Sequence, residues 1–394
     1  MILAATGDVP VTLVELGVVL LVLAVAGRLA RRAGVSTIPL YLLAGLTLGE
    51  GGVLELVTAR DFIETGAEIG VILLLLMLGL EYSGDELVGS LRTTRRAGLL
   101  DILLSATPGV AAGFLLGWDP TAALFLGGIT YVSSSGVVAK VLEELGRIGN
   151  RETPSVLSLL IFEDLVMAVF LPVAASLAVA SGAGETVSDV AIALAAVAVA
   201  FVVTLRFGDR VSRVVSSPSN ELLLLTVLGA AFLVAGGAEQ LGAPGAVVAL
   251  LVGIALSGRA AERTRVVLTP LRDLFAAVFF VFFGLEVDPA SVPSVLPEAA
   301  ALAVVTAATK VFTGMWAARR AGIGLPGRLR AGTVLVARGE FSIILAGIAL
   351  AEGLEPELGA VAAAYVLIVA STGPILTRFA DPVAQRLQAR SESP

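Results

Sequence analysis

The sequence predicts an all-α polytopic membrane protein, and three observations lead to this fold class. Hydrophobic residues make up 57% of the 394 residues and charged residues only 15%, whereas soluble domains are nearer a quarter charged. Apolar segments of about 20 residues, long enough to cross a bilayer as helices, recur along the whole chain. All but two of the arginines lie in alternate loops, as expected when those loops share one side of a membrane.

Hydropathy predicts about thirteen membrane spans. The segment 37–50 is short for a span, and 243–258 is barely long enough. In chain order the predicted spans cover roughly residues 10–27, 37–50, 66–83, 97–117, 120–144, 153–181, 187–206, 219–238, 243–258, 271–286, 295–318, 329–352 and 357–377.

The arginines also predict the orientation of the chain. With the N-terminus outside, every arginine except Arg60 and Arg338 falls in a loop or tail predicted to be cytoplasmic. Cytoplasmic loops of membrane proteins carry such an excess of basic residues. We therefore expect an N-out, C-in protein with an odd number of spans and a short cytoplasmic tail over 378–394. The N-terminal segment lacks a basic region, so no cleaved signal peptide is expected.

Two residue types are missing from the sequence, and their absence limits the chemistry. The chain has no cysteine and no histidine. Thiol chemistry and disulfides are therefore excluded, and histidine, which usually carries protons near neutral pH, has no role. Any proton chemistry must use Asp, Glu or Lys, and we expect no cofactor.

Thirteen spans divide into six, one linking span and six, which gives two halves of opposite topology. Such inverted repeats are common in secondary transporters. Polar residues interrupt the fifth span at Ser133–Gly136 and its counterpart, the twelfth, at Ala337–Phe341. Corresponding interruptions in both halves are typical of a transport site built from discontinuous helices.

Glu163 and Asp164 lie side by side about ten residues into the sixth span, near the middle of the membrane. Intramembrane carboxylates usually face a cavity and mark an ion or proton path. The alternative is a buried structural pair neutralised by basic residues. Asp101 and Glu68 are expected near the ends of their spans, in contact with water, and are not assigned to the site.

Lys310 is one of only two lysines and lies within the eleventh span. A lysine at this depth needs a carboxylate partner or a lowered pKa, and we expect it to pair with Glu163 or Asp164. The alternative is a lysine that extends to the membrane surface. Arg338 and Glu340 either support the interrupted helix, by neutralising helix-end dipoles, or contact the site directly.

The serines Ser133, Ser134 and Ser135 offer hydroxyl and carbonyl oxygens, which suit a hard monovalent cation. Small hydroxyl residues also pack helices together, so this signal is weak alone. Together with Glu163 and Asp164 they form the predicted ion- and proton-binding set, with the monovalent cation at Asp164.

Four motifs occur in an order that resembles the monovalent cation:proton antiporter-2 family. They are SSSGVVAKVLEELG, the FED sequence ending at Asp164, Lys310 followed by Ala318-Arg319, and ARGEFSII. The resemblance covers essentially the whole chain. It is closest to the transmembrane part of Kef-type potassium/proton antiporters, with Nap-type sodium/proton antiporters as relatives.

The resemblance implies a homodimer in which each protomer has a dimerisation scaffold and a mobile core with crossed discontinuous helices. Asp164 matches the family's ion- and proton-binding aspartate, and Lys310 the lysine that pairs with the preceding position. Glu163 departs from the residues typical there. Kef-type proteins usually continue into a nucleotide-binding domain, so a separate cytoplasmic subunit of the RCK/TrkA type could take that role. The scaffold would cover about 1–90 and 219–290, the core about 94–181 and 295–377, and the linker helix 187–206.

These observations predict a secondary active monovalent cation/proton antiporter rather than an enzyme, located in the plasma membrane, the inner membrane of a bacterium. Potassium/proton exchange with potassium efflux is the first expectation, and sodium/proton exchange by the same fold is the alternative. A cation channel would also use serines and carboxylates in broken helices. A symporter of organic solutes stays open, while an intramembrane aspartyl protease needs aspartates on two different helices.

Overall fold

The computed structural model is built from α-helices throughout the residues it describes, which are 9–33, 37–49, 60–80, 84–179, 219–240, 245–256 and 258–391, with isolated positions between 191 and 217. The predicted linker helix 187–206 lies outside them apart from such positions. The helices are α1 (Val9–Ala33), α2 (Ile38–Leu48), α3 (Arg60–Leu80), α4 (Gly84–Leu115), α5 (Pro120–Tyr131), α6 (Ser135–Glu144), α7 (Thr153–Val179), α9 (Asn220–Glu239), α10 (Gly245–Ala255), α11 (Gly258–Glu286), α12 (Val292–Arg320), α13 (Leu325–Val334), α14 (Glu340–Ala351) and α15 (Pro356–Ser391).

Nine helical segments among the described residues are long and apolar enough to cross a membrane, with the divided α5 and α6 counted as one of them. The predicted spans 37–50 and 243–258 appear as the 11-residue helices α2 and α10. The predicted spans 120–144 and 329–352 are each divided into two helices, α5 and α6 in the first half of the chain and α13 and α14 in the second. The prediction of about thirteen spans stays a prediction.

Local sequence explains where several helices begin. The Asp119 side chain accepts hydrogen bonds from the backbone N–H groups of Thr121 and Ala122, and Pro120 occupies the first turn of α5. Ser219 caps α9 in the same way, through the N–H of Leu222. These caps satisfy N–H groups that have no partner inside the helix.

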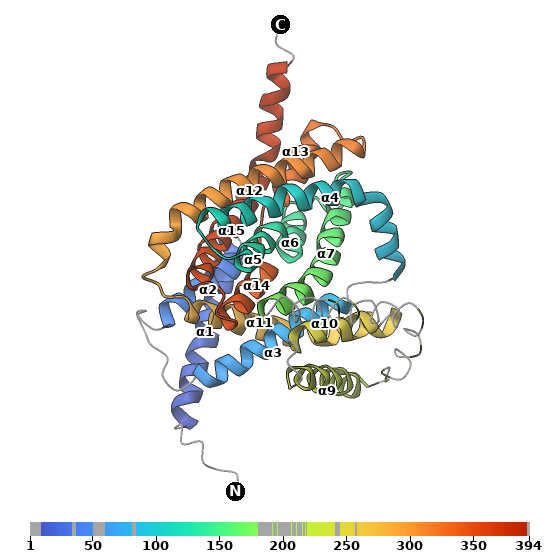
Figure 1. Cartoon of the computed structure of the whole chain (residues 1–394). Helices are drawn as coiled ribbons and strands as arrows, with labels where there is room; N and C mark the ends of the chain where they lie inside the picture. The colour runs from blue at the N-terminus through green and yellow to red at the C-terminus, as the bar shows by residue number, and fades with distance from the viewer. Residues whose placement is uncertain are drawn as a thin grey trace.

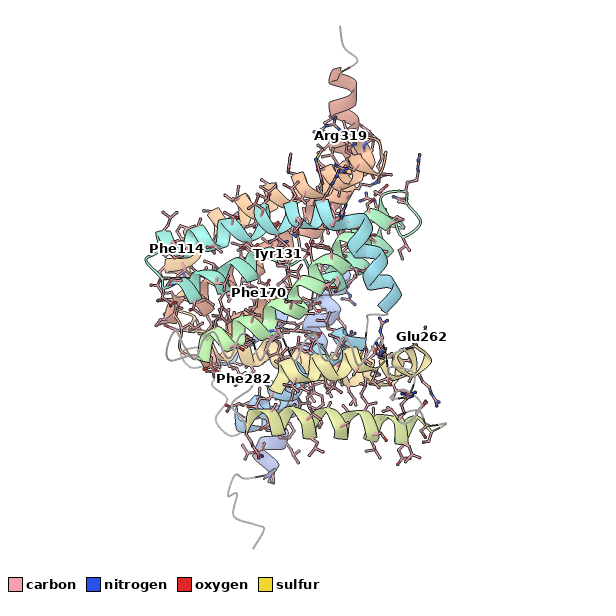
Figure 2. All side chains as sticks on the ribbon, turned by 45° about the vertical axis from the view of Figure 1, so that its right-hand side comes forward. Phe114, Tyr131, Phe170, Glu262, Phe282 and Arg319 are labelled. Atoms are coloured by element: carbon pink, nitrogen blue, oxygen red, sulfur yellow. The ribbon has the colours of Figure 1, made fainter. Side chains whose placement is uncertain are left out.

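The helices pack in two groups (Figure 1). The crossing group, α4–α7 with α12–α15, contains both divided helices, and in it α4 lies against α5, α7 and α12. The flanking group contains α2, α3 and α9–α11, and in it α3 lies against α10 and α11. Figure 2 shows Tyr131 within the crossing group and Phe282 within the flanking group.

Glycines allow the helices of the flanking group to approach closely. A Cβ atom on Gly253 of α10 would overlap the Leu76 carbonyl and the Gly79 Cα of α3. The same holds for Gly45 of α2 against Val281 and Gly284 of α11. Small residues at such contacts are typical of helix packing in membranes, where close backbone contact replaces the hydrophobic driving force.

Candidate functional site

The two divided helices meet at their breaks, in the middle of the crossing group. The backbone N–H of Ser134 donates to the Ala337 carbonyl at 2.9 Å, and the Ser133 hydroxyl donates to the Leu335 carbonyl at 2.9 Å. The Ser134 hydroxyl donates to Glu340 Oε2 at 2.9 Å. Backbone groups that the breaks free from helical bonding thereby find partners across the crossing, as irregular backbone at membrane depth requires.

Arg338 neutralises the negative ends of two half-helices. Its guanidinium is fully buried and donates to the Thr130 carbonyl, near the end of α5, and to the Leu335 and Val336 carbonyls, just after α13. The C-terminal end of a helix carries a partial negative charge on its unsatisfied carbonyls. Of the two roles predicted for Arg338, these bonds match the structural one.

Carboxylates lie at the opposite, positive ends of the divided helices. Glu163 Oε2 accepts a hydrogen bond of 2.6 Å from the Ser133 N–H, just before α6 begins. Glu340 is the first residue of α14 and accepts from Ser134. Negative side chains are stabilised near helix N-termini. The crossing therefore places its negative charges at two positive helix ends and its arginine at two negative ones.

Lys310 binds two carboxylates in a fully enclosed cluster. Its Nζ lies 2.9 Å from Glu163 Oε1 and 2.6 Å from Asp101 Oδ2, and all three side chains are 0% exposed. The Ser105 hydroxyl holds the other Asp101 oxygen at 3.0 Å, and the Lys310 ammonium lies 5.2 Å from the centre of the Tyr131 ring. The predicted ion pair with Glu163 is present, and the snorkelling alternative does not apply.

The expectation that Asp101 lies in water near a span end is wrong. Asp101 is buried because α4 packs against both α7 and α12, which carry its partners. Its signal in the sequence is of the same kind as that of Glu163, a carboxylate inside an apolar segment. The predicted span begins at residue 97, which places Asp101 near its start. The helix α4 instead extends from Gly84 to Leu115, so Asp101 lies near its centre.

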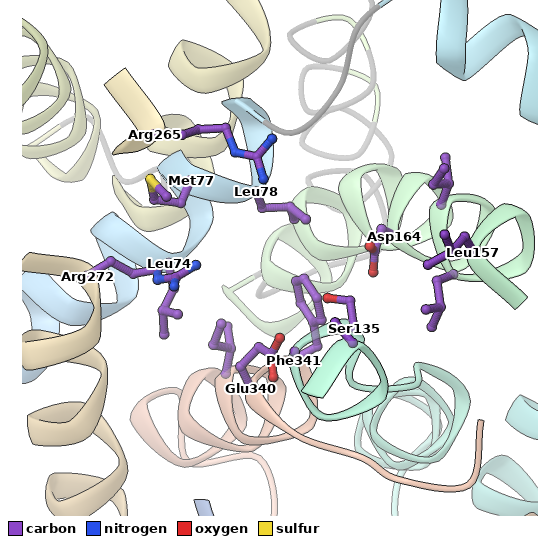
Figure 3. A pocket seen from close by; sticks show the side chains of 15 residues that line it. Leu74, Met77, Leu78, Ser135, Leu157, Asp164, Arg265, Arg272, Glu340 and Phe341 are labelled. Atoms are coloured by element: carbon purple, nitrogen blue, oxygen red, sulfur yellow. The ribbon is translucent and has the colours of Figure 1, made fainter. Parts of the chain in front are cut away.

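Asp164, next to Glu163, lines a cavity of about 460 Å³ between the two groups of helices. Figure 3 shows Asp164, Ser135 and Glu340 on the crossing-group side and Leu74, Met77, Arg265 and Arg272 on the flanking side. Adjacent helical residues point about 100° apart, so Glu163 reaches the lysine while Asp164 reaches the cavity. Oxygen atoms from Asp164, Ser135 and Glu340 could receive a hard cation there.

The three predicted serines have separate positions. Ser133 and Ser134 are buried, and their hydroxyls bond within the crossing. Ser135 lines the cavity with Asp164.

A second cavity, of about 400 Å³, lies between the same two groups on the far side of Ile344, which lines both. It is lined by Glu64, Glu68 and Glu286 together with apolar side chains of α11 and α14. The first cavity carries Arg265, from a loop predicted to be cytoplasmic, and the second carries Glu286, the last residue of α11. Glu68 is exposed, as expected.

Comparisons with known proteins agree on one family. Residues 18–380 match the model of the family described as "Sodium/hydrogen exchanger, transmembrane". The chain is 33% identical to the K(+)/H(+) antiporter subunit KhtU of Bacillus subtilis, over 92% of each chain. It is 30% identical to the Ammonium/H(+) antiporter subunit AmhT of Alkalihalophilus pseudofirmus, over 95% of this chain and 94% of the relative.

A solved structure shares the fold. The sodium proton antiporter MjNhaP1 from Methanocaldococcus jannaschii matches 97% of this chain and 99% of its own, with a TM-score of 0.70 at 18% sequence identity.

Proposed function

The chain belongs to the sodium/hydrogen exchanger family and is a multi-pass membrane cation/proton antiporter, and from this premise we propose that it exchanges potassium for protons at Asp164. The observation that carries the proposal is the position of Asp164, beside the crossing of two divided helices and at the wall of a cavity. Two relatives, at 33% and 30% identity, are named for potassium and for ammonium, two cations of similar size. Sodium is the second candidate, because the family description names it.

The proposed mechanism is competition for one carboxylate. A proton or a monovalent cation neutralises Asp164, and the crossing group then moves relative to the flanking group so that the site faces the other side. An empty, charged Asp164 crosses poorly, because burying an uncompensated charge costs several kcal/mol or more. This barrier couples the two fluxes, since only a loaded site completes the movement. A channel would have no such barrier, and its ion flux would not be coupled to protons.

The contacts around Lys310 indicate that its charge stays in place during transport and is not exchanged with the cargo. Two buried carboxylates bind the ammonium at once, so the lysine keeps one anionic partner even if the other is protonated. We therefore propose that Glu163, Lys310 and Asp101 hold the structure of the site while Asp164 carries the cargo. One proton then exchanges for one cation, and the transport is electroneutral.

The expected homodimer, the location in a plasma membrane and the partner subunit belong to the same proposal. The crossing group would be the mobile core and the flanking group part of the scaffold. Both relatives are named as subunits of antiporters, which supports a second, cytoplasmic polypeptide. We expect it to regulate exchange by binding at the arginine-rich inner face.

The decisive experiment uses purified protein in liposomes that hold a pH gradient. Potassium, sodium, lithium, rubidium and ammonium salts are added in turn, and dissipation of the gradient is followed by a fluorescent dye. We expect potassium, rubidium and ammonium to dissipate it in the wild type, and no cation to do so in Asp164→Asn, because the amide cannot exchange a proton. A membrane-potential dye in the same vesicles should show no change in fluorescence, because electroneutral exchange moves no net charge.

Asp119→Asn is a matched control, because it makes the same change at a helix cap far along α5 from the crossing. Exchange that survives in a folded Asp164→Asn variant would refute the assignment. Cation flux that ignores the pH gradient would instead indicate a channel. If the wild type responds to no cation, adding the partner subunit distinguishes a missing activator from a wrong function.

A further inference from the structure

A third cavity lies apart from the Asp164 site, where the first turns of α7 meet α4 and the end of α12. Its volume is about 590 Å³, and it shares no lining residue with the Asp164 cavity. Three arginines line it, Arg95 and Arg96 from α4 and Arg320 from α12. All three are exposed, and all three belong to loops predicted to be cytoplasmic. With this predicted orientation, the cavity opens at the level of the inner membrane surface.

The charge around this cavity is of one sign. No carboxylate is among the described residues that line it. Glu152, which precedes α7, turns instead to Arg330 and Asn150. The cavity also faces the beginning of α7, where the helix dipole is positive. Three guanidinium groups and a positive helix end leave this space with a strong preference for an anion.

The polar lining of the cavity fits a phosphate. Ser155 and Ser158 of α7 and Thr94 of α4 add hydroxyl groups beside the arginines. Arginine binds phosphate oxygens through two parallel N–H groups, and hydroxyls donate to the remaining oxygens. Basic pockets between transmembrane helices on the cytoplasmic side bind anionic lipid head groups. We propose that this cavity binds a phosphate group, carried by an anionic lipid or free in the cytosol.

The position of the cavity gives this binding a structural consequence. Its three helices are the ones that carry Asp101, Glu163 and Lys310. Ala97 lies one turn before Asp101, and Ala317 two turns after Lys310. The Phe162 ring packs on Gly98 between the cavity and the cluster. A phosphate in the cavity would join the ends of α4, α7 and α12 and so stabilise the helices around the buried lysine.

The test compares two variants of equal charge by their binding, independently of transport. One replaces the cavity arginines (Arg95→Gln, Arg96→Gln, Arg320→Gln). The other replaces three exposed arginines that do not line the cavity (Arg28→Gln, Arg151→Gln, Arg319→Gln). Native mass spectrometry counts bound phosphatidylglycerol or cardiolipin against phosphatidylcholine, and thermal unfolding in detergent is recorded with inorganic phosphate.

We expect the wild type and the control triple variant to retain anionic lipid, and each lost cavity arginine to weaken binding about fivefold. If the source is a lipid, phosphatidylglycerol or cardiolipin binds and raises the unfolding temperature, whereas inorganic phosphate has no effect. If the source is free phosphate, the inorganic ion alone raises it. Equal binding by the two triple variants, or binding of neither probe to the wild type, would overturn the proposal.

Arg320→Lys tests whether lost binding could come from misfolding. It keeps the positive charge but removes the bidentate guanidinium donor. Reduced binding with an unchanged unfolding temperature in the absence of ligand supports the site, and wild-type binding in both Arg320→Lys and Arg320→Gln would contradict the role of Arg320.

Discussion

Lys310 binds both Asp101 and Glu163, and all three side chains are fully buried. The desolvation of such a cluster is costly, and its stability depends on every member being present. Asp164 stands outside these bonds, in the cavity wall. Adjacent carboxylates of one helix thus have different surroundings, which supports different roles for them.

We expect Lys310→Met to destabilise the protein by about 3–5 kcal/mol, because the substitution leaves two buried carboxylates without their cation. Thermal unfolding in detergent measures the effect. Adding Asp101→Asn and Glu163→Gln to the same variant should restore most of the loss, since neutral amides of similar size need no counter-ion. A Lys310→Met variant as stable as the wild type, or a triple variant no better than the single one, would contradict this.

At the scale of elements, an ion-pair network joins the ends of helices in the crossing group that lie near the predicted cytoplasmic side. Arg330 of α13 binds Glu152, just before α7, and Asp381 of α15. Arg147, in the turn after α6, binds the same Asp381 at 2.8 Å. Burial by itself would raise the pKa of Glu152, but hydrogen bonds from Arg330 and Asn150 outweigh it and hold the pKa below the usual 4.5.

The sign of this shift predicts a loss of stability in acid. Because the folded-state pKa of Glu152 is lowered, its contribution is fully present above about pH 4.5 and is lost as the pH falls through the folded-state pKa. We expect the unfolding temperature of Glu152→Gln to depend less on pH below 4.5 than that of the wild type. Glu352→Gln, at an exposed position directly after α14, is the control. Parallel pH profiles for wild type and Glu152→Gln would show that Glu152 does not contribute.

At the scale of the whole molecule, the two groups of helices enclose separate cavities on either side of Ile344. This arrangement supports alternating access, in which one cavity closes as the other opens. The movement requires the groups to shift relative to each other, because each is packed too closely to deform within itself.

The absence of natural cysteines makes this movement testable. Leu74 of α3 and Leu157 of α7 line opposite walls of the Asp164 cavity (Figure 3). We expect a reducible crosslink between Leu74→Cys and Leu157→Cys to stop exchange in liposomes, and reduction to restore it. A crosslink between Ala139→Cys and Leu157→Cys, both in the crossing group, should leave exchange intact. Undiminished exchange in the first crosslinked pair would argue against movement of one group past the other.

The sequence alone determined the membrane class, the breaks at Ser133–Gly136 and Ala337–Phe341, and the candidates Glu163, Asp164 and Lys310. Each of these is a polar residue in an apolar segment, and the cost of burying it makes it visible in one dimension. Only the tertiary structure decided which carboxylate binds Lys310, that Asp101 joins it, and that Asp164 faces the cavity. These outcomes depend on how α4, α7 and α12 are rotated and packed against one another, and no local pattern in the chain records that rotation.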